Sequence, residues 1–362
     1  MRISDLSSHG GEWLRGDGPE GDIVLSSRVR LARNLADHRF TTRAADPERR
    51  EVADRVRETV MQSKFAERVF YVDLEKEDPV QGEFLVERHL ISRELARAEG
   101  PRGVAFGSRE AISIMVNEED HLRIQVLQSG CQLEEAWRGA RAVDGLLEAG
   151  LTFAFHPRFG YLTACPTNVG TGLRASVLLH LPALAFSNHI QQVFKAVHQL
   201  SLAVRGLFGE GTEPMGHLFQ ISNQTTLGRS EAEIVGAVGQ IVPQIVKYER
   251  QVREDRLQRG RRALEDRVWR ALGVLRHSRL ISTQETLEHL SAVRLGVNVG
   301  ILEGIDLRLV NDLFILSQPA HLQKLEGRPL DPGERDEVRA AFLRKRLAPG
   351  EGPAENPEAS GA

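Results

Sequence analysis

The hydrophobic pattern changes character near Gly228, and this change limits the possible folds more than any other feature. Before it, strand-like runs at residues 23–34, 111–116 and 122–127 are interleaved with helical stripes. After it, charged sequence of helical periodicity continues to about residue 347 with hardly any strand signal. We therefore predict an α+β protein in which a sheet-containing domain precedes a smaller all-helical domain.

Local sequence signals set the expected boundaries. Residues 10–21 are rich in glycine and should be loose. Ser230 and Glu233 form a capping box that opens the helical part, and Pro243 should kink that first helix. The chain ends in Pro, Gly and Glu without periodic apolar positions. We expect a flexible N-terminus at residues 1–22, a catalytic domain at 23–228, a helical domain at 229–347 and a disordered tail at 348–362.

The composition excludes several classes of protein. The chain has 47 Lys and Arg against 50 Asp and Glu, a net charge of -3, so no overall field attracts nucleic acid or an anionic membrane. Its two cysteines, Cys131 and Cys165, are too few for a disulfide framework and lack zinc-binding spacing. We also expect no export signal and no membrane span. These features predict a cytoplasmic protein without a metal site of its own.

Several arginines adjoin strand-like runs. Arg28 and Arg30 lie on one side of an extended segment, where they can bind phosphate or simply form a solvated edge. Arg123, Arg174 and Arg205 each adjoin another β-like run, beside an acidic turn or a glycine-rich loop. This repetition favours a polyphosphate cradle, although each arginine alone fits the solvated edge better.

Acidic and thiol side chains supply a second kind of chemistry. The turn Glu118-Glu119-Asp120 can hold a cation, supply a base, or be an ordinary acidic hairpin tip. Cys165, before Pro166, can be an activated thiol or an inert core residue. Glu210 lies in a loop with four glycines, which either closes over a substrate or is a mobile surface loop.

One helix near the end of the chain carries two arginines a turn apart. Arg335 and Arg339 can share one anion with Asp336 nearby, or they can belong to a solvated helix face. The residues alone leave both possibilities open.

Three long stretches occurring in this order resemble the phosphagen kinases, the ATP:guanido phosphotransferase family. They are Ser-Ser-Arg-Val-Arg-Leu-Ala-Arg-Asn at residues 26–34, Asn-Glu-Glu-Asp-His-Leu-Arg-Ile at 117–124, and Cys-Pro-Thr-Asn-Val-Gly-Thr-Gly-Leu-Arg-Ala-Ser-Val at 165–177. The chain is most similar to the McsB-type protein arginine kinases, and the resemblance covers nearly its whole length. It implies an antiparallel sheet flanked by helices, and transfer of the γ-phosphoryl group of ATP to arginine side chains of proteins.

The resemblance also implies roles for individual residues. The catalytic positions are Glu119, Cys165 and Glu210. The ATP-binding positions are Ser26, Ser27, Arg28, Val29, Arg30, His89, Arg123, Arg174, Ala175, Ser176, Val177, Leu178, Arg205, Gly206, Leu207, Phe208, Gly209 and Glu210. An allosteric phosphoarginine site is implied at Arg335, Asp336, Arg339 and Ala340. Mg²⁺ is expected on the nucleotide phosphates and not on protein ligands.

The substrate is the least constrained part of this prediction. Small-molecule members of the family carry a helical domain before the first motif, and here that motif begins at Ser26, which favours arginine within proteins. A kinase of free arginine or another guanidino metabolite shares the same catalytic residues, and a non-catalytic phosphoarginine-binding adaptor is a third possibility. The resemblance further implies a homodimer, a role in stress response, and a zinc-binding activator, a heat-shock repressor and a Clp ATPase or protease as partners.

Overall fold

A computed structural model describes residues 10–206 and 215–348. The predicted site residues Leu207, Phe208, Gly209 and Glu210 lie outside the described residues, as does nearly all of the expected C-terminal tail. The chain divides into two compact units, one spanning Gly11–Val252 and the other containing the chain from Arg253 onward.

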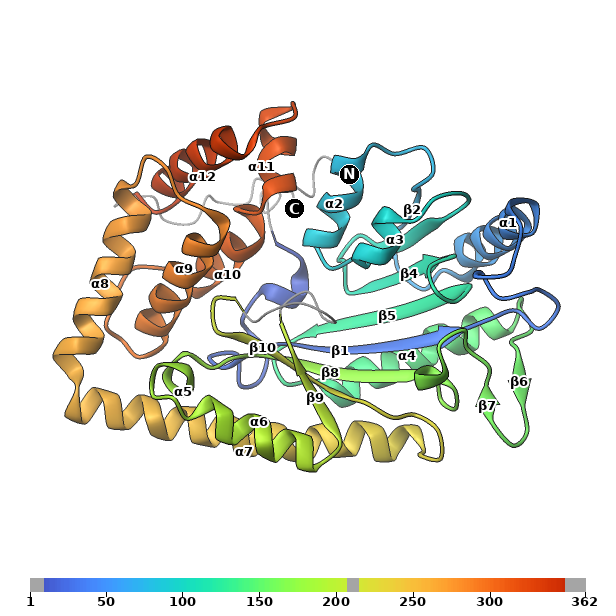
Figure 1. Ribbon diagram of the computed structural model, residues 1–362, viewed down its shortest axis with the longest axis horizontal. Coiled ribbons are helices and arrows are strands. Elements are labelled where there is room, and N and C mark those ends of the chain that lie inside the picture. The colour runs from blue at the N-terminus through green and yellow to red at the C-terminus, as the bar shows by residue number, and fades with distance from the viewer. Residues whose placement is uncertain (1–9, 207–214, 349–362) are drawn as a thin grey trace, which may run out of the picture. The chain divides into compact units, whose positions relative to one another are not determined.

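The first unit is built on one eight-stranded sheet with the order β2-β3-β4-β5-β1-β8-β10-β9 (Figure 1). Every neighbouring pair is antiparallel, as the resemblance implied. The strands are β1 (Val24–Arg33), β2 (Val69–Asp73), β3 (Gly103–Gly107), β4 (Ile112–Val116), β5 (Leu122–Ser129), β8 (Leu173–His180), β9 (Leu202–Arg205) and β10 (Leu218–Asn223), with a separate small hairpin of β6 (Phe155–His156) and β7 (Gly160–Tyr161).

Helices lie between several of these strands along the chain. They are the 3-10 turns η2 (Glu12–Leu14) and η3 (Pro166–Asn168), and the α-helices α1 (Asp46–Ser63), α2 (Pro79–Glu87), α3 (Arg93–Arg97), α4 (Leu133–Glu148), α5 (Pro182–Phe186), α6 (Ile190–Gln199) and α7 (Glu231–Arg259). The acidic turn joins β4 to β5, so the predicted hairpin is confirmed. The stretch that forms β2, α2, α3 and β3 was not assigned from the sequence.

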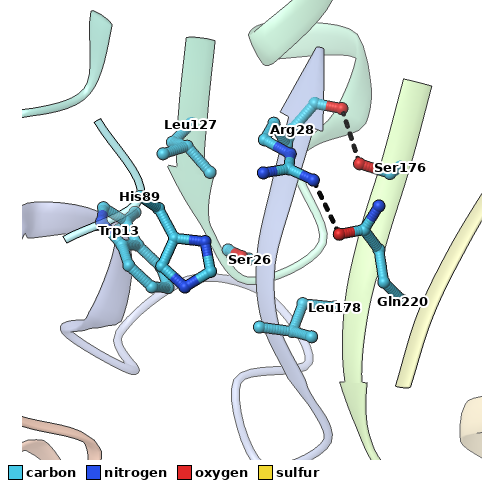
Figure 2. Close-up of a pocket in the computed structure, with 8 residues that line it drawn as sticks. All are labelled: Trp13, Ser26, Arg28, His89, Leu127, Ser176, Leu178 and Gln220. Carbon is cyan, nitrogen blue, oxygen red and sulfur yellow. Dashed lines mark hydrogen bonds between the residues drawn. The ribbon is translucent and has the colours of Figure 1, made fainter. Parts of the chain in front are cut away.

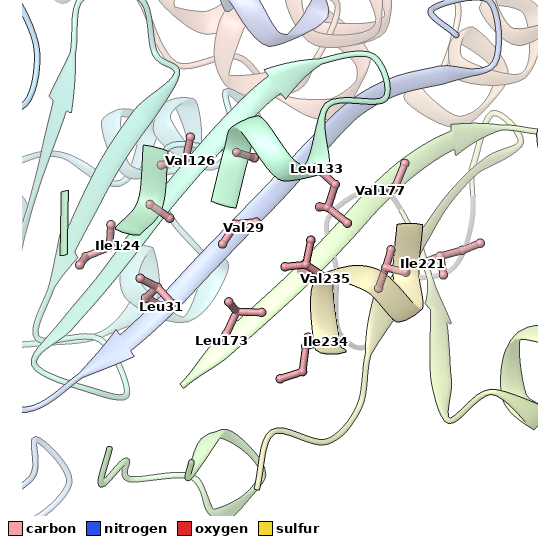
Figure 3. Close-up of a cluster of buried hydrophobic side chains, with 14 of the residues drawn as sticks. Val29, Leu31, Ile124, Val126, Leu133, Leu173, Val177, Ile221, Ile234 and Val235 are labelled. Atoms are coloured by element: carbon pink, nitrogen blue, oxygen red, sulfur yellow. The ribbon is translucent and has the colours of Figure 1, made fainter. Parts of the chain in front are cut away.

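One face of the sheet is apolar and covered by helices (Figure 3). Val29 and Leu31 on β1 are fully buried there, and Leu133 on α4 packs in the same cluster. The apolar residues of α4 recur every three or four positions, which gives the helix one hydrophobic stripe for the sheet. Because side chains alternate between faces along each strand, the polar residues of β1 lie on the opposite face.

Helix α7 explains where the first unit ends. Its apolar residues from Ile234 to Val252 belong to the core of the sheet unit, so the division falls inside this helix. The sequence had predicted a boundary between residues 228 and 229, because the hydrophobic pattern changes there from strand-like runs to helical periodicity. Pro243 lies within the helix without ending it.

The second unit is helical throughout its described part. It contains α8 (Arg261–His277), α9 (Thr283–Asn298), α10 (Leu307–Leu316), α11 (Pro319–Glu326) and α12 (Pro332–Arg346). Helix α12 begins with a capping box between Asp331 and Glu334, which satisfies two backbone N–H groups. Of the helices in residues 10–206 and 215–348, none has the length and apolar character needed to cross a membrane.

Candidate functional site

The strand register places the five predicted nucleotide-binding arginines on one face of the sheet. Arg30 on β1 lies opposite Arg174 on β8. Arg28 precedes Arg30 by two residues and therefore lies on the same face of β1. Arg123 is two residues from Gln125, which lies opposite Arg30. Arg205 on β9 lies opposite Gln220 on β10. Gln220 in turn lies opposite Leu178 on β8, which is on the same face as Arg174. This arginine face is the side opposite the helix-covered core.

The charges on this face act on one another. Burial lowers the pKa of Arg28 to about 10, with further lowering by Arg174, Arg123 and Arg205. Burial and then Arg28 also lower the pKa of Arg30, whereas Glu118 acts in the opposite direction. Guanidinium groups remain protonated under such shifts at neutral pH, so the face carries concentrated positive charge. It is suited to a polyanion such as a triphosphate.

Several buried polar atoms of this face have no hydrogen-bond partner among the described residues. They include Arg30 Nε, Gln220 Nε2 and Ser222 Oγ. The other end of the Gln220 amide accepts a hydrogen bond of 2.7 Å from Arg28 Nη2. Buried groups of this kind are uncommon in folded proteins, and on this face a bound ligand could supply their hydrogen-bond partners.

A pocket opens at one end of the arginine face (Figure 2). Figure 2 shows the rings of Trp13 and His89 at one end of it, and the hydrogen-bonded Arg28 and Gln220 at the other. Burial, followed by the charges of Arg28, Arg93 and Arg30, lowers the pKa of His89 to about 3, so its imidazole is neutral at physiological pH. The remaining lining residues are Ser26, Leu127, Ser176 and Leu178.

The acidic turn lies at the start of β5, at the opposite end of the strands from Ser26. Arg123 Nη1 donates to Glu118 Oε1 at 2.7 Å, and Ser92 Oγ donates to the same oxygen. Glu119 has one long contact, 3.4 Å from Arg123 Nη2, and 41% of its side chain is exposed. Burial raises the pKa of Glu119, against the opposing effect of Arg123. Glu118 is therefore occupied by partners within the chain, while Glu119 remains available to a substrate.

Hydrogen bonds connect this turn to the cysteine loop. Asp120 Oδ1 accepts from Asn34 Nδ2 at 2.6 Å and from the backbone N–H of Ala164 at 2.7 Å. Cys165 follows directly, half-buried, with its Sγ 3.0 Å from Thr167 Oγ1. Asn34 closes the first motif and also accepts from the N–H of His121 at 2.9 Å. The structure thus brings the loops that carry Glu119 and Cys165 together.

Some predicted ATP-binding residues point away from this face. Four of them lie on the apolar face of the sheet according to the strand register: Ser27, Val29, Ala175 and Val177. The Ser27 hydroxyl donates a hydrogen bond of 2.9 Å to the carbonyl of Gly130. Only their backbone groups are therefore available to a nucleotide. Gly206 is buried just after β9 and is the last described residue before the gap.

Sequence reasoning missed Trp13, Leu127 and Gln220, which line the pocket. Trp13 lies in the glycine-rich stretch that was expected to be loose, and no spacing rule connects Gln220 to Arg28. Packing explains one glycine of the loop after Cys165, because a Cβ at Gly172 would lie 2.6 Å from the carbonyl oxygen of Ala32.

The four residues of the implied allosteric site have different environments. Arg339 is buried, and it donates to the carbonyls of Ser317 and Ile281 at 2.8 and 2.9 Å and to Asp336. Ala340 is buried in the helical core, and Arg335 is half-buried. Arg339 therefore holds helix α12 against neighbouring segments of its own unit.

The described residues contain no group of three or more His, Cys, Asp or Glu side chains arranged to hold a metal ion.

Two family profiles match the chain. The ATP:guanido phosphotransferase C-terminal catalytic domain matches residues 51–252, and the protein-arginine kinase McsB C-terminal domain matches residues 261–358. The first match ends at the residue where the sheet unit ends.

Curated relatives match almost end to end. A protein-arginine kinase of Halothermothrix orenii is 48% identical over 96% of this chain and 99% of its own length. That of Symbiobacterium thermophilum is 50% identical over 93% and 96%, and that of Bacillus subtilis is 46% identical over 92% and 93%.

Solved structures support the same fold. The duplicated taurocyamine kinase of Schistosoma mansoni, with bound transition-state analog components, is 25% identical with a TM-score of 0.57. The match covers 69% of this chain and 35% of that one. A lombricine kinase is 28% identical, with a TM-score of 0.55 and coverage of 68% and 70%.

Proposed function

The chain belongs to the protein-arginine kinases of the ATP:guanido phosphotransferase family, and we propose that its arginine face holds ATP while Glu119, Cys165 and Glu210 hold the acceptor arginine. The observation that carries this proposal is the register that gathers Arg28, Arg30, Arg123, Arg174 and Arg205 on one face.

The nucleotide lies along the arginine face with its base toward His89 and its γ-phosphate toward the acidic turn. Two features support this orientation. The pocket that contains aromatic and apolar residues lies at the Ser26 end of β1, and the carboxylates and Cys165 lie at the other end. The arginines stabilise the charge that spreads over the transferred phosphoryl group and the departing ADP.

Phosphoryl transfer requires loss of a proton from the acceptor, because a protonated guanidinium is a poor nucleophile. Glu119 takes a proton from a guanidinium nitrogen, and that nitrogen attacks the γ-phosphorus. The P–N bond forms while the bond from the γ-phosphorus to the bridging oxygen of ADP breaks, and ADP leaves with that electron pair. The raised pKa of Glu119 makes it a stronger base than an ordinary carboxylate. Cys165 orients the guanidinium without forming a covalent intermediate.

Mg²⁺ neutralises phosphate charge in this class of reaction. The arginine face would hold the phosphates to which Mg²⁺ is bound, with water as its remaining ligands. Asp120, which is hydrogen-bonded to the residue before Cys165, accepts hydrogen bonds from Asn34 and Ala164 through Oδ1.

The decisive experiment is mass spectrometry under conditions that preserve phosphoarginine, after incubation of a substrate protein with ATP, Mg²⁺ and the enzyme. Phosphoarginine should appear with the unaltered enzyme and be strongly reduced with Glu119→Gln. A parallel incubation with free arginine separates a protein kinase from a kinase of guanidino metabolites. ATP-independent binding of phosphoarginine proteins, with no phosphoryl transfer, would instead indicate an adaptor.

We further propose that the helical unit mediates dimerisation and binds phosphoarginine as an allosteric ligand, and that the enzyme acts in a stress response. The zinc-binding activator, heat-shock repressor and Clp partners are proposed with them. Arg335→Ala is the better test of the allosteric site than Arg339→Ala, because Arg339 also holds two backbone carbonyls of its unit. Loss of stimulation by phosphoarginine in Arg335→Ala, with basal activity retained, supports the proposal, and unchanged stimulation contradicts it.

A further inference from the structure

The N-terminal 3-10 turn η2 packs on the arginine side of the sheet. It contacts β1 and β5, and its Trp13 lines the same pocket as Arg28 and Gln220. Only 2% of Trp13 is exposed, yet its indole N–H has no hydrogen-bond partner among the described residues. Shape and packing, and not a polar anchor, therefore hold the ring at this place.

Trp13 packs edge-on against His89, with ring centroids 4.9 Å apart and an interplanar angle of 69°. His89 follows α2 in a left-handed conformation, with φ of 60°, which is uncommon for a residue with a side chain. Gln125 on β5 holds its carbonyl through a 2.6 Å hydrogen bond. The backbone of His89 is thus fixed by the sheet, and Trp13 limits the positions open to its ring.

The surroundings of these rings change in character along the pocket. The two neutral aromatic rings of Trp13 and His89 lie at one end, and the Arg28–Gln220 pair lies at the other (Figure 2). Two apolar side chains line the pocket beside that pair, Leu127 opposite Arg28 and Leu178 opposite Gln220 in the sheet. A flat heteroaromatic base favours stacking on aromatic rings and apolar contact, whereas phosphates favour guanidinium groups. The order of surfaces therefore matches the order of groups in a nucleotide.

We propose that Trp13 is a wall of the nucleotide-base site, where it contacts the purine ring of ATP directly and positions His89 against it. The inference rests on the proposed placement of ATP along the arginine face. It makes the N-terminal turn at residues 12–14 a part of the nucleotide site, although the phosphate-binding residues all lie on the sheet.

The direct test uses the fluorescence of Trp13 in the full-length enzyme. The chain has three tryptophans, and Trp137 and Trp269 lie outside the pocket. In the variant Trp137→Phe with Trp269→Phe, ADP should change the emission of the remaining Trp13, while tripolyphosphate, which lacks a base, should change it much less. In Trp13→Phe, the other two tryptophans should report no such change. An ADP-saturated enzyme whose Trp13 emission is unaltered overturns the inference.

Binding measurements by calorimetry separate this inference from the proposal beneath it. Trp13→Ala should weaken ADP binding by about tenfold or more while leaving tripolyphosphate binding unchanged, and Trp13→Phe should restore most of the ADP affinity. If both variants bind ADP as the unaltered enzyme does, only the role of Trp13 is lost. If the unaltered enzyme binds neither ADP nor tripolyphosphate, or if Arg30→Gln leaves both affinities unchanged, the nucleotide site on the arginine face is wrong as well.

Discussion

Arg30 on β1 lies directly opposite Arg174 on β8 in an antiparallel pair. Like charges at directly opposed positions of a sheet oppose folding, and here burial strips solvent from Arg30 as well. Under the proposed function, a polyanion bound at this place would supply negative charge that offsets this repulsion. Stability and function are therefore in opposition at Arg30.

Arg30→Gln should separate these two effects. Without nucleotide, the free energy of unfolding should stay constant or rise by up to about 1 kcal/mol, because one of the opposed charges is gone. The value of kcat/KM for ATP should fall by about 10²-fold or more, because a donor to the phosphates is lost. Urea denaturation and steady-state kinetics measure the two. Arg50→Gln, at an exposed residue paired with Glu75 on the surface, is the control and should change neither.

Glu119→Gln should lower kcat by about 10²- to 10⁴-fold, the usual contribution of a general base. Since burial raises the pKa of Glu119, the activity of the unaltered enzyme should fall at a pH above the ordinary carboxyl range as the solution is acidified. A pH profile of kcat/KM measures this acid limb, and the residual activity of Glu119→Gln should lack it. The exposed carboxylate of Glu58 on α1 serves as the control position. An acid limb that is the same in both enzymes would assign the titration to another group.

Cys165 should be the thiol whose modification inactivates the enzyme. It is half-buried at the start of η3, beside the loop that carries Glu119. Iodoacetamide should abolish activity, and ADP together with an arginine-containing protein should slow the loss. Cys165→Ala should retain reduced activity that iodoacetamide no longer affects. Cys131→Ala should remain sensitive, because burial raises the pKa of Cys131 and leaves less reactive thiolate. Protection by Cys131→Ala would contradict this assignment.

Asp120 should act by joining two loops and not as a base. Asp120→Ala leaves the Asn34 amide and the Ala164 N–H without their acceptor, so the free energy of unfolding should fall by about 1–3 kcal/mol. Asp120→Asn keeps an acceptor oxygen for both donors and replaces Oδ2, which has no partner among the described residues. It should retain stability in urea denaturation and most of the activity. Equal losses of activity in the two variants, with stability intact, would point to a catalytic carboxylate instead.

The sequence allowed the prediction of long, strongly patterned elements. Helix α4 has an apolar stripe repeated every three or four residues, and the β4–β5 hairpin has two β-rich runs around an acidic turn. The elements β2, α2, α3 and β3 were not assigned because they are short, and neighbouring packing decides such segments more than local propensity does. Helix α11, of eight residues, was missed for the same reason.

The amino-acid sequence by itself determined the kinds of chemistry available, since the motifs at residues 26–34, 117–124 and 165–177 carry the arginines, the carboxylates and the thiol. Only the tertiary structure decided which of them meet. Strands far apart in the chain pair with a specific register, and a shift of one residue would exchange the two faces of a strand. The observed register turns Arg28 toward the arginine face and Ser27 toward the core. The place of Trp13 beside His89 likewise depends on contacts between residues distant in sequence, which no local pattern encodes.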